Sequence, residues 1–313
     1  MMKFILRRLG QMAPVVLIMT FIVFSLTLLI PGDATVTILG EQSSMQDRAK
    51  LRTELGLDKA VPVQYASWLS GVATGDLGRS IATREPVMQM LKTRLPITLQ
   101  LTLQAVLLAV LVGVPLGILA AARRNTWVDV AASTTAMTAM AIPYFWVGIL
   151  LIMLFSISFS WLPPSGFVSF STSPAENFRT MLMPTLTVGL SMAGLVMRQT
   201  RTSMVQVLSQ DYIRTARAKG VSPFGVIVFH ALRNALIPVV TVVGLQAGVL
   251  VGGAVVTETV FGLPGLGRMI VDAIFQRDFP VVQGGILVVV MLVLIVNLLT
   301  DLAYGALDKR IKL

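Results

Sequence analysis

The sequence has no cysteine, a single histidine and few charges among its 313 residues. The lack of cysteine excludes disulfide bonds, thiolate metal ligands and thiol catalysis. Charged residues make up only 13% of the chain, whereas soluble domains contain about 25%. A Gly-x4-Gly-Lys-Ser/Thr phosphate loop is also missing, so the chain has no sequence signature for hydrolysing ATP. These absences disfavour a membrane enzyme, and they leave His230 as a packing or interface residue.

Apolar residues dominate instead: 55% of the chain is hydrophobic and the mean hydropathy is +0.81. A membrane-spanning helix needs about 20 such residues. The charge-free runs that approach this length are Gln11–Ile30, Ile97–Ala121, Val130–Leu162, Thr180–Met197, Asn234–Thr257 and Phe279–Thr300. The first is longer than the apolar core of a signal peptide and predicts a retained anchor. The sequence therefore predicts an all-α membrane protein with six transmembrane helices.

The distribution of charge predicts the orientation of these helices. When the N-terminus and alternate connecting segments are assigned to the cytoplasm, the whole net charge of +10 falls on cytoplasmic segments. This agrees with the excess of Lys and Arg in cytoplasmic loops of membrane proteins. Both termini are therefore expected in the cytoplasm.

The outer segment 31–96 differs from the spans because charged and apolar residues alternate in it at helical spacing. We expect short amphipathic helices that form a compact outer layer. An ordinary cap and a contact surface for a partner or substrate both remain open for this segment.

The fifth run carries three glycines spaced by four, Gly244, Gly248 and Gly252, followed by Glu258. Residues four apart share one helix face, and small residues there allow close helix packing. Close packing is the favoured interpretation, and lining of a transport pathway is the alternative. Glu258 is expected to be hydrated at the membrane interface, with a pathway role as the alternative.

The segment "DYIRTARAKGVSPFGVIVFHALRNALIP", residues 211–238, is unusually basic for its surroundings. It predicts two short helices. Asp211 is expected to cap the first and Gly220 to end it. Ser222 is expected to cap the second, with Pro223 in its first turn, where a missing N–H costs nothing.

On the first of these helices, Tyr212, Ala216 and Gly220 fall four apart and form a small face with a basic rim. Such a face suits docking into a groove on another protein. An ordinary positive loop that fixes the topology explains the pattern equally well.

Within this segment, "YIRTARAKG" and "HALRNALIP" resemble the cytoplasmic coupling segment of ABC importer permeases, in particular the dipeptide/oligopeptide/nickel group. The resemblance extends along nearly the whole chain, through "RRLGQMAPVVL", "PGD", "LGLDK", "GDLGRS", "AIPYFW", "FGLPGLGR" and "RDFPVVQGG". It implies the type I ABC importer permease fold. In domain terms it implies an anchor helix and outer loop in residues 1–94, a permease domain in 95–304 with its coupling segment at about 205–237, and a basic cytoplasmic tail in 305–313.

The resemblance assigns ATPase coupling to Tyr212, Arg214, Thr215, Ala216, Arg217, Ala218, Lys219, Gly220 and Pro223. The broader importer pattern has Glu-Ala-Ala where this chain has Arg214, Thr215 and Ala216, so the role of the glutamate is not carried over.

The resemblance also implies the partners: a second homologous permease, two ATP-binding subunits and an extracytoplasmic solute-binding protein in the bacterial inner membrane, with no nucleic acid. ATP and Mg are expected on the partner subunits, and no cofactor or metal on this chain. Dipeptides or oligopeptides are the expected substrates. Nickel or another small solute is the alternative, and a secondary transporter is the alternative from a different class.

Overall fold

The computed structural model describes residues 2–29, 42–54, 56 and 58–307. Within these residues the fold is helical, and the only β-type pairing is an isolated bridge between Arg79 and Pro86. The elements are α1 (Met2–Leu29), α3 (Met45–Glu54), α4 (Val61–Thr74), α5 (Val87–Ala122), α6 (Trp127–Ala141), α7 (Tyr144–Leu151), η1 (Ile152–Ser158), α8 (Pro174–Leu208), α9 (Asp211–Ala218), α10 (Pro223–Gly225), η2 (Val226–Ala231), α11 (Leu232–Gly253), α12 (Val255–Val260), α13 (Leu266–Phe275) and α14 (Phe279–Leu307).

Five helical stretches among the described residues are long and apolar enough to cross a membrane, and a bent pair supplies a sixth. They correspond to the six predicted runs, although two of them are much longer. α5 has 36 residues and begins ten residues before the predicted span, while α8 has 35 and contains both Arg179 and Arg198. The charges that bound the apolar runs therefore lie within continuous helices rather than at their ends.

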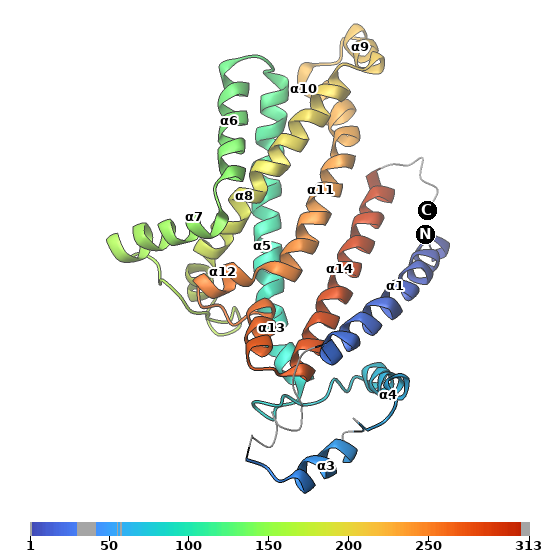
Figure 1. Ribbon diagram of the computed structural model, residues 1–313. Helices are drawn as coiled ribbons and strands as arrows, with labels where there is room; N and C mark the ends of the chain where they lie inside the picture. Colours follow the sequence, from blue (N-terminus) through green and yellow to red (C-terminus); the bar gives the residue numbers. More distant parts are fainter. Residues whose placement is uncertain (1, 30–41, 55, 57, 308–313) are drawn as a thin grey trace.

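The centre of the bundle is the packing of α5 against α8, which is the most extensive helix contact in the described structure (Figure 1). A Cβ added at Gly113 would lie 2.7 Å from the Ala193 carbonyl oxygen, and one at Gly117 would lie 2.6 Å from the Thr200 Cβ. Real side-chain atoms do not approach so closely, so the two backbones can meet only because glycine stands at these positions.

The over-long third run, Val130–Leu162, is not one straight span. α6 ends at Ala141, Pro143 precedes α7, and the two helical parts are bent by 93°. Proline disfavours helical geometry in the residue before it, so the chain leaves the helix at Ile142, which is extended. α7 consequently projects sideways from the bundle (Figure 1).

The fifth predicted span, Asn234–Thr257, is also interrupted. α11 ends at Gly253, and Thr257 belongs to the separate short helix α12. Such a break at membrane depth is tolerated where the backbone is buried in protein or lines a cavity. At its other end, α11 is preceded by the π-helical turn η2, which continues into it.

The outer segment carries two short helices, α3 and α4, at the end of the molecule opposite α9 (Figure 1). Tyr65 of α4 packs edge-on against Phe21 and Phe24 of α1, and its hydroxyl lies 2.8 Å from the Thr20 hydroxyl. The outer layer is thereby attached to the first span, as expected. Residues 30–41 of the predicted loop and 308–313 of the basic tail lie outside the described residues.

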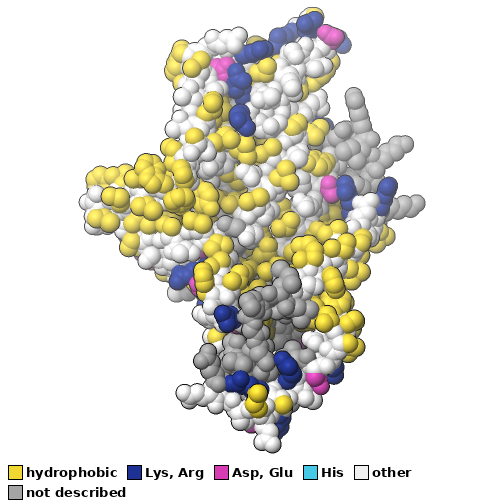
Figure 2. All heavy atoms as spheres, in the orientation of Figure 1, with side chains coloured by type: hydrophobic (Ala, Val, Ile, Leu, Met, Phe, Trp, Pro, Cys, Tyr) yellow, Lys and Arg dark blue, Asp and Glu magenta, His cyan; other side chains and the backbone are white. Residues whose placement is uncertain are grey.

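Basic side chains gather at the end that carries α9, which we call the inner end, while those at the opposite end lie among acidic side chains (Figure 2). Apolar side chains cover the middle of the visible face and the projecting α7 region. Near this inner side, Arg8 of α1 pairs with Asp301 of α14 at 3.2 Å, which joins the two helices that lead to the termini. The arrangement agrees with the predicted orientation.

The glycine stripe of α11 faces α14. A Cβ at Gly244 would overlap the Thr300 side chain, whereas one at Gly252 would lie 3.3 Å from Val289 Cγ1 and one at Gly248 would lie 3.8 Å from Val293 Cγ1. The tightest contact is therefore at Gly244, Gly252 is also closely packed, and ordinary van der Waals space remains beside Gly248.

The two glycines provide a matched pair of substitutions. We expect Gly244→Ala to lower stability by about 1–3 kcal/mol, because overpacking forces neighbouring atoms to move. Gly248→Ala has room for its methyl group and gains helix propensity, so it should be neutral or stabilising. Thermal unfolding of the detergent-solubilised proteins measures both, and equal midpoints would contradict the assigned packing.

Candidate functional site

The short helix α9 follows α8 at the inner end of the molecule (Figure 1) and packs mainly against η2. Ile213 is fully buried there in an apolar cluster with Ala121 of α5, Met204 of α8 and Val226 of η2. Ile213 therefore anchors α9 to the spans by burying its side chain, which contributes roughly 1.5–3 kcal/mol.

The turn after α9 has the geometry expected from its sequence. Gly220 has a φ of +78°, and its N–H donates to the Arg217 carbonyl at 2.9 Å. The Ser222 side chain then accepts a hydrogen bond from the Gly225 N–H at 3.2 Å, with Pro223 at the start of α10. Asp211 differs from its predicted role: Gln210 is the N-cap residue, and the Asp211 carboxylate instead pairs with Arg214 at 3.3 Å.

The small face predicted for docking does not form a continuous exposed surface. Ala216 is 7% exposed because its side of α9 faces the bundle. Tyr212 is 43% exposed, and its hydroxyl accepts a hydrogen bond from the Asn234 amide at 2.9 Å. Ala216 is the one buried member of the predicted coupling set; the exposed members are Tyr212, Arg214, Thr215, Arg217, Ala218, Lys219, Gly220 and Pro223.

Sequence reasoning missed an aromatic residue beside this basic surface. Phe224, the second residue of α10, is 70% exposed. A large exposed apolar side chain among basic residues is typical of a protein-contact anchor. The available signal was an aromatic residue between Pro223 and Gly225 in an otherwise polar turn.

A cavity of about 430 Å³ lies under the α9–α10 turn. Its walls come from the ends of α5 and α8 and from η2, and Arg124 and Arg217 contribute the basic side chains of its lining. These two arginines place positive charge at the inner end, next to the exposed face of α9. Such a surface is suited to bind an acidic group on a partner protein.

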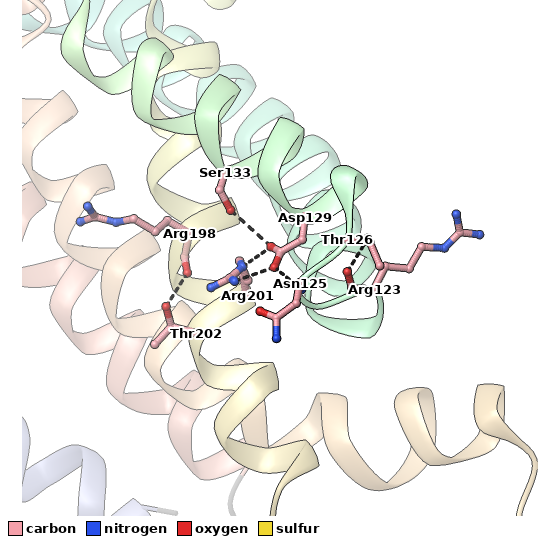
Figure 3. A network of polar contacts seen from close by, with 8 residues as sticks. All are labelled: Arg123, Asn125, Thr126, Asp129, Ser133, Arg198, Arg201 and Thr202. Atoms are coloured by element: carbon pink, nitrogen blue, oxygen red, sulfur yellow. Dashed lines mark hydrogen bonds and ion pairs between the residues drawn. The ribbon is translucent and has the colours of Figure 1, made fainter.

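A buried ion pair joins α6 to α8 near the same end (Figure 3). Asp129 is 3% exposed and accepts hydrogen bonds from Arg201 through both carboxylate oxygens, one of them at 2.7 Å. The Asn125 backbone N–H at 3.0 Å and the Ser133 hydroxyl at 3.4 Å complete its surroundings. Bidentate Arg–carboxylate pairs fix both distance and orientation, so this pair holds α6 in place against α8.

Glu258 lies in the interior rather than at a hydrated interface. Its side chain is 0% exposed and accepts hydrogen bonds from the Thr98 hydroxyl at 2.6 Å and the Arg268 N–H at 2.8 Å. Burial raises the pKa of the Glu258 carboxyl. The Leu266 N–H donates to Thr98 Oγ1 at 2.8 Å, so Glu258 and Thr98 together satisfy the start of α13 and tie it to α5.

A third buried acid, Asp278, was not singled out from the sequence. It is 2% exposed and accepts hydrogen bonds from the Ser80 hydroxyl and from the N–H groups of Ile81, at 3.0 Å, and Ala82, at 3.3 Å. It therefore secures the turn after "GDLGRS" to the start of α14.

None of these acids forms a metal site, since no group of three His, Cys, Asp or Glu side chains gathers among the described residues.

The Asp129–Arg201 pair can be tested by removing one partner. Asp129→Ala leaves the Arg201 guanidinium, whose side chain is 29% exposed, without its bidentate partner, and we expect a loss of about 1.5–3 kcal/mol, as for hydrogen bonds to a charged group. Arg123→Ala, which removes an exposed cation nearby, is the control and should change little. Thermal unfolding of the purified proteins measures the difference; if both variants unfold together with the parent, the pair does not hold α6 in place.

Comparison with known proteins identifies the family. Residues 113–313 match the family "Binding-protein-dependent transport system inner membrane component", and residues 1–102 match the N-terminal region of such membrane components. The chain is 43% identical over 336 residues to the dipeptide transport system permease protein DppB of Escherichia coli (strain K12), covering 100% of this chain and 99% of that protein. It is 42% identical over 333 residues to the di/tripeptide transport system permease protein DppB of Pseudomonas aeruginosa (strain UCBPP-PA14), with the same coverage.

Solved structures share the fold at low sequence identity. A chain of the MetNI methionine ABC transporter, in an inward-facing conformation, superposes with a TM-score of 0.57 and 19% identity, over 71% of this chain and 97% of that chain. A chain of an amino acid ABC transporter gives a TM-score of 0.51 and 15% identity, over 71% of this chain and 94% of that chain. The likeness shows the type I ABC importer permease fold. The chain thus belongs to the inner-membrane components of binding-protein-dependent ABC transport systems, as a multi-pass membrane permease.

Proposed function

We propose that this chain is a permease subunit that imports dipeptides and oligopeptides with energy supplied by partner ATPases. The observation that carries the proposal is the inner surface of α9 and α10, where Arg214, Arg217 and Phe224 are exposed on a helix anchored to the spans by Ile213. The names of the Escherichia coli and Pseudomonas aeruginosa relatives support peptides as the substrate.

The proposed assembly contains a second homologous permease, two ATP-binding subunits and an extracytoplasmic solute-binding protein. The family's description, which refers to binding-protein-dependent transport, supports these partners. ATP and Mg bind to the ATPase subunits in this proposal, because this chain lacks a phosphate loop. The chain itself is therefore not an enzyme.

Energy passes through direct side-chain packing in this proposal. A displacement of α9 by a docked ATPase moves Ile213, which is packed among residues of α5, α8 and η2. The Asp129–Arg201 pair extends the same rigid unit to α6. Because packed interiors transmit strain rather than absorb it, motion of α9 reaches the α5–α8 core.

Truncation of the exposed aromatic tests the docking surface. We expect Phe224→Ala to weaken ATPase binding by about 2 kcal/mol, roughly thirtyfold, as for an interface anchor. Phe178→Ala is the control, because Phe178 is 61% exposed on α8 near its outer end. Copurification of the ATPase subunits and ATP-dependent uptake of a labelled dipeptide in reconstituted vesicles measure the effect. Unchanged binding and uptake in Phe224→Ala would exclude this surface as the contact.

A pair of substitutions at Gly220 tests the shape of the turn. No atom lies within 4 Å of a Cβ built there, so its positive φ is the main constraint. We expect Gly220→Val to misplace α10 and reduce ATPase binding, because a β-branched residue at positive φ costs roughly 1–3 kcal/mol. Gly220→Asn tolerates this backbone and should retain most of the binding. Equal binding by both variants in the copurification assay would show that the turn geometry does not matter for docking.

A further inference from the structure

We infer that a cavity between α7, α8, α11 and α12 is a substrate-binding site on the transport route, and that it binds the amide groups of peptides. The inference rests on the proposed peptide-import function and names the side chains that would contact the substrate within the membrane. The cavity has a volume of about 140 Å³. Its lining includes Leu250 and Ala254, at the break between α11 and α12. This break lies away from the inner end that carries α9 (Figure 1).

Four helices each contribute one polar side chain to this cavity: Tyr144 from α7, Ser191 from α8, Gln246 from α11 and Thr257 from α12. The rest of the lining is apolar, with Met192 on the wall and the exposed Val249 at the rim. An apolar hollow with a few convergent polar groups is the usual composition of a small-molecule site.

These polar groups have no hydrogen-bond partner among the described residues. Thr257 is fully buried, and its hydroxyl oxygen has no hydrogen-bond partner among the described residues. The Gln246 amide and the hydroxyls of Ser191 and Tyr144 likewise form no hydrogen bond within the described part of the chain. Burying a polar group without a partner costs about 1–3 kcal/mol in proteins, so the fully buried Thr257 hydroxyl indicates a ligand or water that satisfies it. The other three polar side chains are half-buried and can bind the same ligand.

The interruption of the helix supports the same conclusion. α11 ends at Gly253 and α12 continues in a different direction, which places the last α11 carbonyls next to the cavity. The Leu250 carbonyl accepts a hydrogen bond from the Ala254 N–H at 3.1 Å, and this end of α11 carries the negative end of the helix dipole. Broken helices at membrane depth are tolerated where they line a cavity of this kind.

The chemistry of the lining selects the ligand. It offers one carboxamide and three hydroxyl groups, which both donate and accept hydrogen bonds, and it contains no charged side chain. A peptide group presents one N–H donor and one carbonyl acceptor and is neutral, so it matches these groups. A divalent cation would meet none of the His, Asp or Glu ligands that it prefers.

The test uses the assembled transporter in vesicles, with radiolabelled dialanine as the probe. In Gln246→Leu and Thr257→Val, dialanine uptake per ATP hydrolysed should fall about two- to tenfold, which corresponds to the loss of one hydrogen bond. Gln246→Asn keeps the carboxamide and should recover part of the uptake. Thr259→Val is the control, because Thr259 lies on α12 but is exposed and bonds to the Val255 carbonyl.

A second measurement reports the site without depending on flux. The chain has no cysteine, so Gln246→Cys and Thr259→Cys each introduce one thiol that a water-soluble reagent can label. Dialanine, delivered by the binding protein, should slow labelling of Gln246→Cys and leave Thr259→Cys unchanged. Parental uptake per ATP in both Gln246→Leu and Thr257→Val, or labelling of Gln246→Cys that is unaffected by dialanine, would overturn the assignment of the site. ATP hydrolysis without any dialanine uptake by the parent transporter would instead overturn the peptide-import function and the peptide occupant with it.

Discussion

The close approach of the α5 and α8 backbones is the constraint on which the rest of the bundle depends. Glycines on both helices make it possible: Gly113 and Gly117 on α5, and Gly189 on α8, where an added Cβ would lie 2.6 Å from the Leu108 side chain. In lipid no hydrophobic force drives helices together, so stability must come from backbone-level packing of this kind. Three contacts attach other elements to this rigid core. The Asp129–Arg201 pair holds α6, Ile213 anchors α9, and the hydrogen bond between Thr98 and Glu258 ties α13 to α5.

Around that core, the interrupted helices carry the functional features. The third span bends at Pro143, and the fifth begins with the α10–η2 turn and ends at the α11–α12 break. Each interruption lies beside one of the two candidate sites: the inner docking surface or the polar cavity. A continuous helix satisfies its own backbone and offers little to a ligand, whereas a broken one exposes groups that need partners. Rigid and interactive parts of the chain are thus separated in space.

The sequence predicted the spans, the orientation and the Gly220–Ser222 turn, because these depend on local hydropathy, charge and backbone preference. It did not predict burial within the helical bundle. Ala216 and Glu258 were expected at exposed positions and lie inside, and Asp129 and Asp278 were not recognised as buried acids. The partner of Asp129, Arg201, lies 72 positions away in the chain, and the partner of Asp278, Ser80, lies 198 positions away. Such distant contacts cannot be found from local sequence. An apolar run shows its length and not its direction, so the size of the 93° bend at Pro143 was not predicted.

The burial of Ile213 and Ala216 has a thermodynamic consequence for the subunit. The same short helix contributes to the folded core on one side and presents the proposed docking surface on the other, so local folding and the proposed partner binding share one equilibrium. Any ligand that binds only the folded form of α9 stabilises it by mass action. By linkage, a change that weakens the packing beneath α9 also lowers the affinity for that ligand. The inner end of this subunit would then be at its most ordered only within the assembled transporter.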